Sequence, residues 1–314
     1  MLVTGAAGFV ASHLCEALAA DGHEVVGVDS LDDYYAARLK QRTAAELREK
    51  GVGMIRCDLA GDELRRLLPE SAAVFHLAAQ PGISASVGMP VYVRNNIVAT
   101  HALLETCSAW RQPPLFVYAS TSSVYGKRAT SPETAVPEPT SYYGVTKLAA
   151  EQLALAYWRE GRLPACAMRL YSVYGPRERP DKLFSKLIMS LLAEREFPLH
   201  EGSREHRRSF TYVGDAVAGL VSVLARRSSG VGETFNIGSD VERTTGEVIA
   251  AVERIVGMKA RCRIVPPRPG DQIATRARIE KARTMLGYAP RTTLEEGLER
   301  QVAWCREHFL QHDE

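Results

Sequence analysis

The stretch Leu2-Val3-Thr4-Gly5-Ala6-Ala7-Gly8-Phe9-Val10-Ala11 lies at the start of the chain and decides its fold. Its first three residues predict a short strand, its glycines predict a tight turn, and residues 9–20 predict an amphipathic helix. A second strand is predicted at residues 24–28 and is followed at once by Asp29. Glycines let a backbone approach a pyrophosphate, a helix N-terminus offers free N–H groups, and the acidic residue accepts hydrogen bonds from the ribose of adenosine. This order therefore predicts a dinucleotide-binding turn.

Asp29 also bears on which dinucleotide is bound. A carboxylate at this position repels a 2′-phosphate, so the sequence favours NAD over NADP. Arg38 and Lys40 lie downstream in a stretch predicted to be a basic loop, and both are candidate cofactor contacts. Because these cations would suit a 2′-phosphate, NADP remains the alternative.

The rest of the first half alternates between strand and helix patterns. Strands are predicted at residues 54–57, 73–77 and 115–119, with a long helix at 91–110. Such alternation is typical of a doubly wound parallel sheet, an α/β fold in which ligands bind at the carboxyl ends of the strands. Asp58, Ala78 and Thr121 each come at or after the end of a predicted strand, so we expect them to share one crevice with Tyr143.

Two further stretches, Ser120-Thr121-Ser122-Ser123-Val124-Tyr125-Gly126 and Tyr143-Gly144-Val145-Thr146-Lys147, carry candidate catalytic groups. Tyr143 and Lys147 lie one turn apart on a predicted helix, and Thr121 follows a predicted strand. Free tyrosine has a pKa of roughly 10, but a nearby ammonium and a positively charged nicotinamide ring favour the phenolate. Thr121 could then relay a proton between a substrate hydroxyl and Tyr143. The alternative is that Tyr143 and Lys147 are ordinary surface residues, since Tyr-x-x-x-Lys alone is a weak pattern.

Composition excludes several classes of protein. The chain has 314 residues, 46% of them hydrophobic, which suits one large α/β domain, or a large one with a smaller partner domain. Its formal net charge of +2 gives no footprint for a nucleic-acid partner, and no apolar run reaches the length of a membrane span. The first residues are already strand and turn, so no secretory signal is expected. Six scattered cysteines without a Cys-x-x-Cys pair are typical of buried thiols in a reducing cytosol, so we expect a cytoplasmic protein without disulfides or a metal site.

Taken together, these stretches resemble the extended short-chain dehydrogenase/reductase family of nucleotide-sugar epimerases and dehydratases. The resemblance covers nearly the whole chain. It rests on Thr-Gly-Ala-Ala-Gly-Phe-Val from Thr4, Asp29, Asp58-Leu59, His76-Leu77-Ala78-Ala79, Ser122-Ser123-Val124-Tyr125-Gly126, Tyr143-x-x-x-Lys147 and residues 169–177. It implies a Rossmann domain at about 1–175 with a return at about 209–238, and a smaller α/β substrate domain mainly within 176–314. It also implies a homodimer, with the helices around 91–110 and 142–160 at the interface.

Individual roles follow from the same resemblance. The expected catalytic residues are Thr121, Tyr143 and Lys147. The expected cofactor contacts are Gly5, Gly8, Phe9, Val10, Asp29, Arg38, Lys40, Asp58, Leu59, Leu77, Ala78, Ala79, Asn96, Tyr143 and Lys147. The expected substrate contacts are Thr121, Ser122, Ser123, Tyr143, Ser172, Arg179, Arg208, Arg268 and Asp271. Within that set, the resemblance assigns Arg208 and Arg268 to the diphosphate and Asp271 to the ribose or uridine.

Differences between the subfamilies reduce the number of reactions that this chain is expected to catalyse. Dehydratases of this family carry an Asp-Glu pair directly after the catalytic threonine, where this chain has Ser122-Ser123. Decarboxylases typically have asparagine where this chain has Ser172. A serine there, followed by Arg179-Pro180-Asp181, looks like the UDP-glucuronate 4-epimerases, and hydroxyl donors suit a sugar carboxylate. Ser84 stands where many relatives have arginine, so a neutral sugar remains an alternative substrate.

The expected function is therefore the NAD-dependent 4-epimerisation of a UDP-sugar, UDP-glucuronic acid to UDP-galacturonic acid, through a 4-keto intermediate. Two near alternatives are a UDP-glucose/UDP-galactose 4-epimerase and a UDP-glucuronate decarboxylase. A distant alternative is a non-catalytic NAD-sensing protein, although the retained Tyr143 and Lys147 argue against a sensor.

Overall fold

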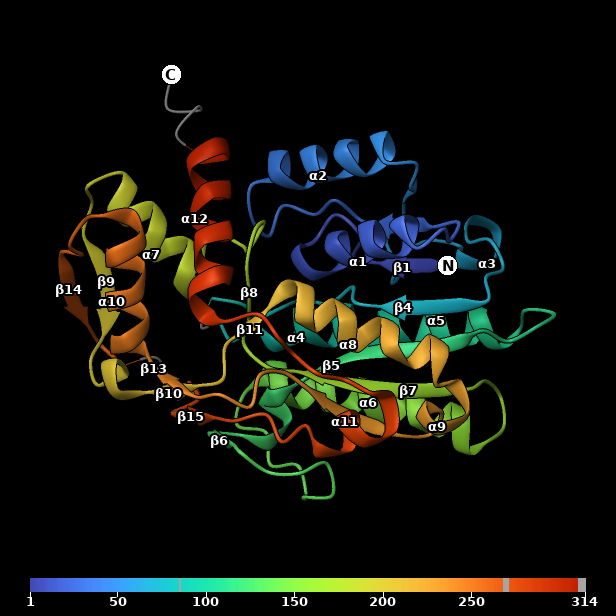
Figure 1. Ribbon diagram of the computed structural model, residues 1–314. Coiled ribbons are helices and arrows are strands. Elements are labelled where there is room, and N and C mark those ends of the chain that lie inside the picture. The colour runs from blue at the N-terminus through green and yellow to red at the C-terminus, as the bar shows by residue number, and fades with distance from the viewer. Residues whose placement is uncertain (85, 268–270, 310–314) are drawn as a thin grey trace.

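A seven-stranded parallel sheet forms the centre of the computed structural model, which describes residues 1–84, 86–267 and 271–309 (Figure 1). Its strands are β1 (Leu2–Thr4), β2 (Val26–Asp29), β3 (Gly53–Arg56), β4 (Ala73–His76), β5 (Leu115–Thr121), β7 (Ala165–Leu170) and β12 (Thr234–Ile237). They lie in the order β12-β7-β5-β4-β1-β2-β3, and every neighbouring pair is parallel. The strand order reverses between β1 and β4, where ligands bind in open sheets of this kind. The predicted doubly wound α/β sheet is confirmed.

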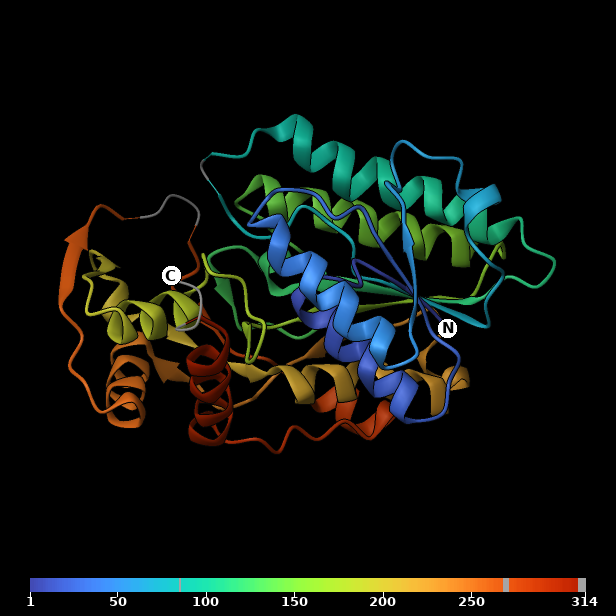
Figure 2. The same cartoon turned by 90° about the horizontal axis from the view of Figure 1, so that it is seen from above.

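Helices cover both faces of this sheet (Figure 2). One face carries α1 (Phe9–Ala20), α2 (Ala37–Glu49), α8 (Val213–Ala225) and α11 (Glu280–Leu286). The other carries α3 (Leu64–Leu67), α5 (Ala99–Ser108) and α6 (Tyr142–Arg159). The central strand β5 is buried at all of its positions, because helices pack on both of its sides. This explains why it appears in the sequence as a continuous apolar run rather than as an alternating one.

A smaller lobe packs beside the carboxyl ends of the strands (Figure 1). It contains α7 (Leu183–Leu192), β9 (Phe197–His200), α10 (Thr245–Val256) and α12 (Leu294–Phe309), which share one apolar core, and β14 (Cys262–Val265), a largely exposed strand that pairs with β9. The sequence defines both ends of α10. Thr244 and Glu247 form a reciprocal capping box at its start, and Gly257 ends it in the left-handed conformation.

The chain passes between the two lobes several times. Ala277, Ile279 and Tyr288 join the core on the α1 face of the large sheet, although they follow the strands of the smaller lobe in sequence. In the other direction, β6 (Arg128–Ala129) pairs with β15 (Ala274–Thr275) in a four-stranded sheet outside the large one. Other short elements are β8 (Val173–Tyr174), β10 (Arg207–Arg208), β11 (Thr211–Tyr212), β13 (Arg243–Thr244), α9 (Arg227–Gly230), η2 (Ser122–Tyr125) and η3 (Ser203–Glu205).

The long helix predicted at residues 91–110 is not regular throughout. It consists of α4 (Met89–Tyr92), a π-helical segment η1 (Val93–Val98), and α5. Wide turns of this kind often occur at functional sites. Across the described residues, no helix is both long enough and apolar enough to cross a membrane.

Candidate active site

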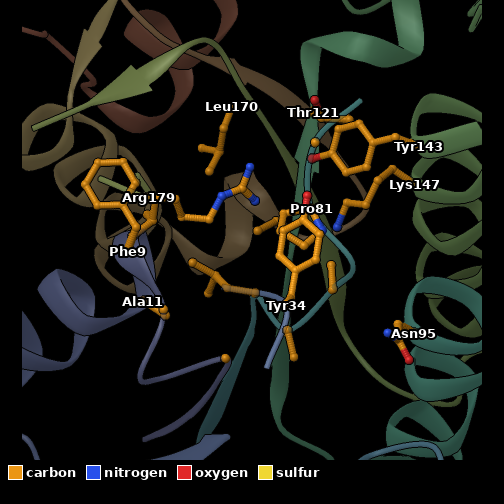
Figure 3. A pocket seen from close by; sticks show the side chains of 18 of the residues that line it. Phe9, Ala11, Tyr34, Pro81, Asn95, Thr121, Tyr143, Lys147, Leu170 and Arg179 are labelled. Atoms are coloured by element: carbon orange, nitrogen blue, oxygen red, sulfur yellow. The ribbon is translucent and has the colours of Figure 1, made fainter. Parts of the chain in front are cut away.

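A cavity of about 830 Å³ lies at the carboxyl ends of β1, β2, β4, β5 and β7, beside the smaller lobe (Figure 3). Most of the residues expected from the sequence line it. They are Gly5, Gly8, Phe9, Val10, Asp29, Lys40, Asp58, Leu59, Leu77, Ala78, Ala79, Thr121, Ser122, Ser123, Tyr143, Lys147, Ser172, Arg179, Arg208 and Asp271. The fold therefore brings the glycine turn, the Tyr-Lys helix and the arginines of the second half to a single cavity.

Two of the expected residues that the structure describes are not among those that line it. Arg38 is exposed on α2, because the stretch predicted as a basic loop forms a helix that turns this side chain to solvent. Asn96 is 1% exposed and lies behind the wall, where its side-chain oxygen accepts a hydrogen bond from Gln80 N and its amide donates to Thr146. Arg268 lies outside the described residues.

The glycine turn leaves the backbone open toward the cavity. Gly5 has a φ of +71°, and a Cβ there would meet the backbone nitrogen of Ala78 at 2.9 Å, so glycine is required. Gly8 lies at the N-cap of α1 and has no side chain that could cap the helix. The first-turn N–H groups of α1 are therefore available to an anion. These features fit the pyrophosphate of a dinucleotide.

The adenosine end of the cavity is built around two aspartates at the end of β2. Asp29 accepts hydrogen bonds from the backbone N–H groups of Ala7 at 3.0 Å and Leu31 at 2.8 Å. Burial raises the pKa of Asp29, and these hydrogen bonds and the charge of Lys40 oppose that rise. Lys40 itself forms an ion pair with Asp32 at 2.7 Å. Its ammonium is thus already engaged by a carboxylate, which weakens the case for a 2′-phosphate site.

Two asparagines on the π-helical segment η1 have different environments. Asn95 lines the cavity, whereas its neighbour Asn96 joins the loop after β4 to α6 through the hydrogen bonds described above. Nearby, Arg94 pairs with Asp58 at 2.6 Å, and this hydrogen bond lowers the pKa of Asp58. Asn96 was the expected cofactor contact, but Asn95 is the member of the pair that lines the cavity, and both lie on a π-helical segment where a regular helix was predicted.

Thr121, Tyr143 and Lys147 meet at the other end of the cavity (Figure 3). Thr121 is the last residue of β5, and Tyr143 and Lys147 lie on the first turns of α6. Close packing of α6 depends on Gly144, where a Cβ would meet the carbonyl oxygen of Ser123 at 2.7 Å. The Thr121 hydroxyl accepts a hydrogen bond from Ser123 N at 3.2 Å, which leaves its own proton free to be donated.

The charge state of this end differs from the expectation that Lys147 lowers the pKa of Tyr143. Burial raises the pKa of Tyr143, and the groups that oppose the rise are the Thr121 hydroxyl, by hydrogen bonding, and the Arg179 charge. Lys147 is 3% exposed, and burial lowers its own pKa to about 7, while Glu151 acts in the opposite direction. With a pKa near neutrality Lys147 is only partly protonated there, so its effect on Tyr143 depends on the groups that hold its proton.

The substrate side of the cavity is held by a hydrogen-bonded chain. Arg208 donates to the Asp271 carboxylate at 2.9 Å and to the carbonyl of Gln272 at 2.6 Å. Gln272 in turn donates to the carbonyl of Ser122 at 3.3 Å. Ser172 lines the cavity with a φ of +34°, a conformation that serine seldom adopts. Gln272 was missed from the sequence, since its place beside Ser122 depends on tertiary contacts.

Two cations from the segment before α7 reach into the cavity. Arg179 forms two hydrogen bonds with Asp181, and its guanidinium lies 5.4 Å from the centre of the Tyr34 ring (Figure 3). Lys182 lines the cavity beside it, and within the described residues its ammonium has no hydrogen-bond or ion-pair partner. Neither Tyr34 nor Lys182 was singled out from the sequence, although Lys182 directly follows the Arg-Pro-Asp signal.

Comparison with known proteins agrees with this geometry. Residues 1–238 match the NAD dependent epimerase/dehydratase family. The chain is 38% identical to the uncharacterized UDP-glucose epimerase YtcB of Bacillus subtilis (strain 168), over 97% of each protein. It is 34% identical to UDP-glucuronate 4-epimerase 4 of Arabidopsis thaliana, over 98% of this chain and 76% of that protein.

A solved structure is similarly close over its full length. The UDP-glucuronic acid 4-epimerase of Bacillus cereus, solved in complex with UDP-glucuronic acid and NAD, superimposes with a TM-score of 0.93. The two chains are 37% identical, and the match covers 98% of this chain and 99% of the other. The chain belongs to the NAD dependent epimerase/dehydratase family.

Proposed function

We propose that this protein is an NAD-dependent UDP-sugar 4-epimerase that converts UDP-glucuronic acid to UDP-galacturonic acid. The observation that carries the proposal is the meeting of Thr121, Tyr143 and Lys147 in the cavity that also contains the glycine turn. The Arabidopsis relative and the Bacillus cereus enzyme, both named for this activity, support it.

NAD would be held by residues along the floor of the cavity. Gly5, Gly8 and the first turn of α1 would hold its pyrophosphate, and Asp29 the adenosine ribose. Lys147 would hold the nicotinamide ribose. When bound, NAD supplies the hydride acceptor, and return of the hydride to the sugar regenerates it, so the reaction involves no net oxidation.

Thr121 and Tyr143 would handle the proton of the sugar's 4-hydroxyl. The Thr121 hydroxyl keeps its proton free for donation toward Tyr143, and the Arg179 charge favours the phenolate. Because burial raises the pKa of Tyr143, the phenol needs this positive surrounding to act as a base. One positioned acid–base group of this kind contributes ~10²–10⁴-fold to the rate.

The acidic sugar is favoured by the side chains around the substrate end. Ser122, Ser123 and Ser172 offer hydroxyls, and the cations of Arg179 and Lys182 lie in the same cavity. A carboxylate there would gain charge-assisted hydrogen bonds. A neutral UDP-hexose is the second candidate, because the same hydroxyls can bind a hydroxymethyl group, and the Bacillus subtilis relative named a UDP-glucose epimerase supports it.

The test is to incubate the purified protein with UDP-glucuronic acid, without added cofactor, and to follow the sugar protons by NMR. Formation of UDP-galacturonic acid is the expected result. Parallel reactions with UDP-glucose, and a measurement of carbon dioxide release, separate the neutral-sugar epimerase and the decarboxylase. An unchanged spectrum from protein shown to contain NAD would contradict the proposal.

We also infer a homodimer in which α5 and α6 pair with their copies. Apolar side chains are exposed at the end of η1, which leads into α5, and at the start of α6: Val98 by 45%, Val145 by 42% and Tyr142 by 57%. An exposed apolar patch of this kind marks an interaction surface. Light scattering after gel filtration should give twice the chain mass for the wild type and the chain mass for Val98→Asp with Val145→Asp. A wild-type monomer would contradict the inference.

We infer a nucleotide domain at about 1–175 with a return at 209–238, and a substrate domain mainly within 176–314, which the separate apolar core of the smaller lobe supports. A cytoplasmic location is supported by six cysteines that are all free thiols, five of them buried.

A further inference from the structure

A buried ion pair lies beneath the catalytic strand ends and has no part in the chemistry proposed above. Arg169 on β7 donates to both carboxylate oxygens of Glu151 on α6, at 3.0 and 2.6 Å. Their side chains are 4% and 0% exposed. The Ser120 hydroxyl donates to the same carboxylate at 2.6 Å, and the third Arg169 nitrogen donates to the Tyr125 hydroxyl at 2.6 Å. The carboxylate is therefore fixed by partners on β5 and β7.

Glu151 is placed to act on the catalytic groups. Tyr143, Lys147 and Glu151 follow one another at four-residue intervals along α6 and so lie on one face of the helix. Ser120, which donates to Glu151, directly precedes Thr121 at the end of β5. One carboxylate thus contacts or adjoins both elements that carry the proposed catalytic residues.

Among the groups around the Lys147 ammonium, Glu151 is the one whose charge favours the protonated form. On β5, the Tyr118 ring lies 4.2 Å from Nζ. On β4, His76 is neutral, because burial lowers its pKa to about 3 and both of its ring nitrogens are hydrogen-bonded to threonines. On α6, Tyr143 is a phenol whose pKa burial raises. Among the described residues, Glu151 is the only carboxylate that acts on Lys147, and it opposes the effect of burial.

Stability alone does not account for such a pair. Removing two charges from water costs several kcal/mol per ion, and buried ion pairs can often be replaced by apolar residues without loss of stability. Resting on the function proposed above, we propose that Glu151, clamped by Arg169 and Ser120, is a positioning residue that keeps Lys147 protonated beside Tyr143 and Thr121.

The test measures the proton on Lys147 directly, and so does not depend on which sugar is the substrate. The protein is labelled with ¹³Cε-lysine and titrated by NMR, and the resonance absent from Lys147→Arg identifies Lys147. In Glu151→Gln, the midpoint of this resonance should move to lower pH by about one unit, the scale set by a close opposite charge. The limb of the kcat profile on which activity falls as pH rises should move in the same direction. An unmoved Lys147 midpoint would overturn the proposal.

Two further variants separate charge control from folding. Glu151→Gln leaves a buried, unpaired Arg169, so the double variant Glu151→Gln with Arg169→Gln removes both charges and should still move the midpoint to lower pH. If the pair is only structural, the double variant leaves the midpoint unmoved, which overturns the proposal. Glu151→Asp retains the carboxylate and should bring the midpoint back toward that of the wild type.

Discussion

The two ends of the cavity hold their charged groups in opposite ways. At the adenosine end, Asp29 is held by two backbone N–H groups, and Asp32 is paired with Lys40. At the catalytic end, in the part of the chain that the structure describes, the Lys147 ammonium has no hydrogen-bond or ion-pair partner, and burial brings its pKa to about 7. The first end is complete without a ligand, whereas the second keeps a buried cation unpaired.

This difference shows where the protein gives up stability for chemistry. A buried, unpaired ammonium is costly, and perturbed groups of this kind cluster at functional sites. The adenosine end has only to bind, so its carboxylates can be satisfied within the protein. Changes at the catalytic end should therefore reduce kcat, and changes at the adenosine or diphosphate positions should reduce affinity.

The largest effect in this series is expected for Lys147→Met. Loss of the ammonium should lower kcat by about 100-fold, because Lys147 would hold the nicotinamide ribose and its protonated form would favour the phenolate of Tyr143. Steady-state kinetics on UDP-glucuronic acid measure this, with Lys186→Met, an exposed lysine on α7, as the matched control. A kcat for Lys147→Met equal to that of the control would contradict the assignment of kcat effects to the catalytic end of the cavity.

Asp29→Ala should act on affinity instead. The variant loses an acceptor for the ribose and the two backbone hydrogen bonds that order the loop, so NAD should bind about 10-fold or more weakly. Calorimetry with NAD measures the affinity, and Asp33→Ala, an exposed aspartate of the same loop, is the control. At saturating NAD, kcat should stay close to wild type, and a large loss of kcat under those conditions would contradict the division of roles.

Lys182→Met should have a smaller effect, confined to substrate affinity. Its ammonium lies in the cavity beside Arg179, where it can meet an anionic group of the substrate. Loss of one charge-assisted hydrogen bond should raise KM by roughly 5- to 20-fold and leave kcat unchanged. Comparing how much the variant weakens the binding of UDP and of uridine then shows whether Lys182 contacts the diphosphate. Equal KM values for wild type and variant would show that Lys182 does not face the substrate.

The smallest effect on activity is expected where the lobes join, at Glu16 on α1. Burial raises the pKa of Glu16, but hydrogen bonds from Arg177 and Lys50 outweigh it and lower the pKa to about 2. This carboxylate therefore stabilises the fold fully above its ordinary pKa of about 4.5, and the contribution is lost as pH falls toward 2. Glu16→Gln should lower the Tm at pH 7 but much less at pH 3, with kcat little changed. A Tm difference that is the same at both pH values would count against the ion pairs.

The sequence predicted the parts of the site that local patterns determine. Gly5, Asp29 and Thr121 follow directly from strand ends, and the parallel sheet brings strand ends to one edge. It failed where position depends on helix geometry or on contacts distant in sequence. Arg38 points to solvent because residues 37–49 form a helix. Gln272 reaches Ser122 only through the path of the second half.

The structure differs from the sequence-based prediction at two other points, and neither difference can be read from a residue pattern. Asn95 rather than Asn96 lines the cavity, because a π-helical turn interrupts the helix that carries both. The effect of burial on Lys147 and Tyr143 depends on how deeply they are packed, and this is a property of the fold. The charge state of the catalytic end was therefore the least predictable feature of the site.

The most direct measurement compares the kcat of Tyr143→Phe with that of Tyr142→Phe on UDP-glucuronic acid, with the NAD content of both variants determined. Tyr142 is the adjacent tyrosine and is 57% exposed, so it controls for any general effect on α6. If the Tyr143 phenol exchanges the proton of the 4-hydroxyl, Tyr143→Phe retains NAD and loses at least ~100-fold in kcat, while Tyr142→Phe is unchanged. Wild-type turnover by Tyr143→Phe would contradict the account.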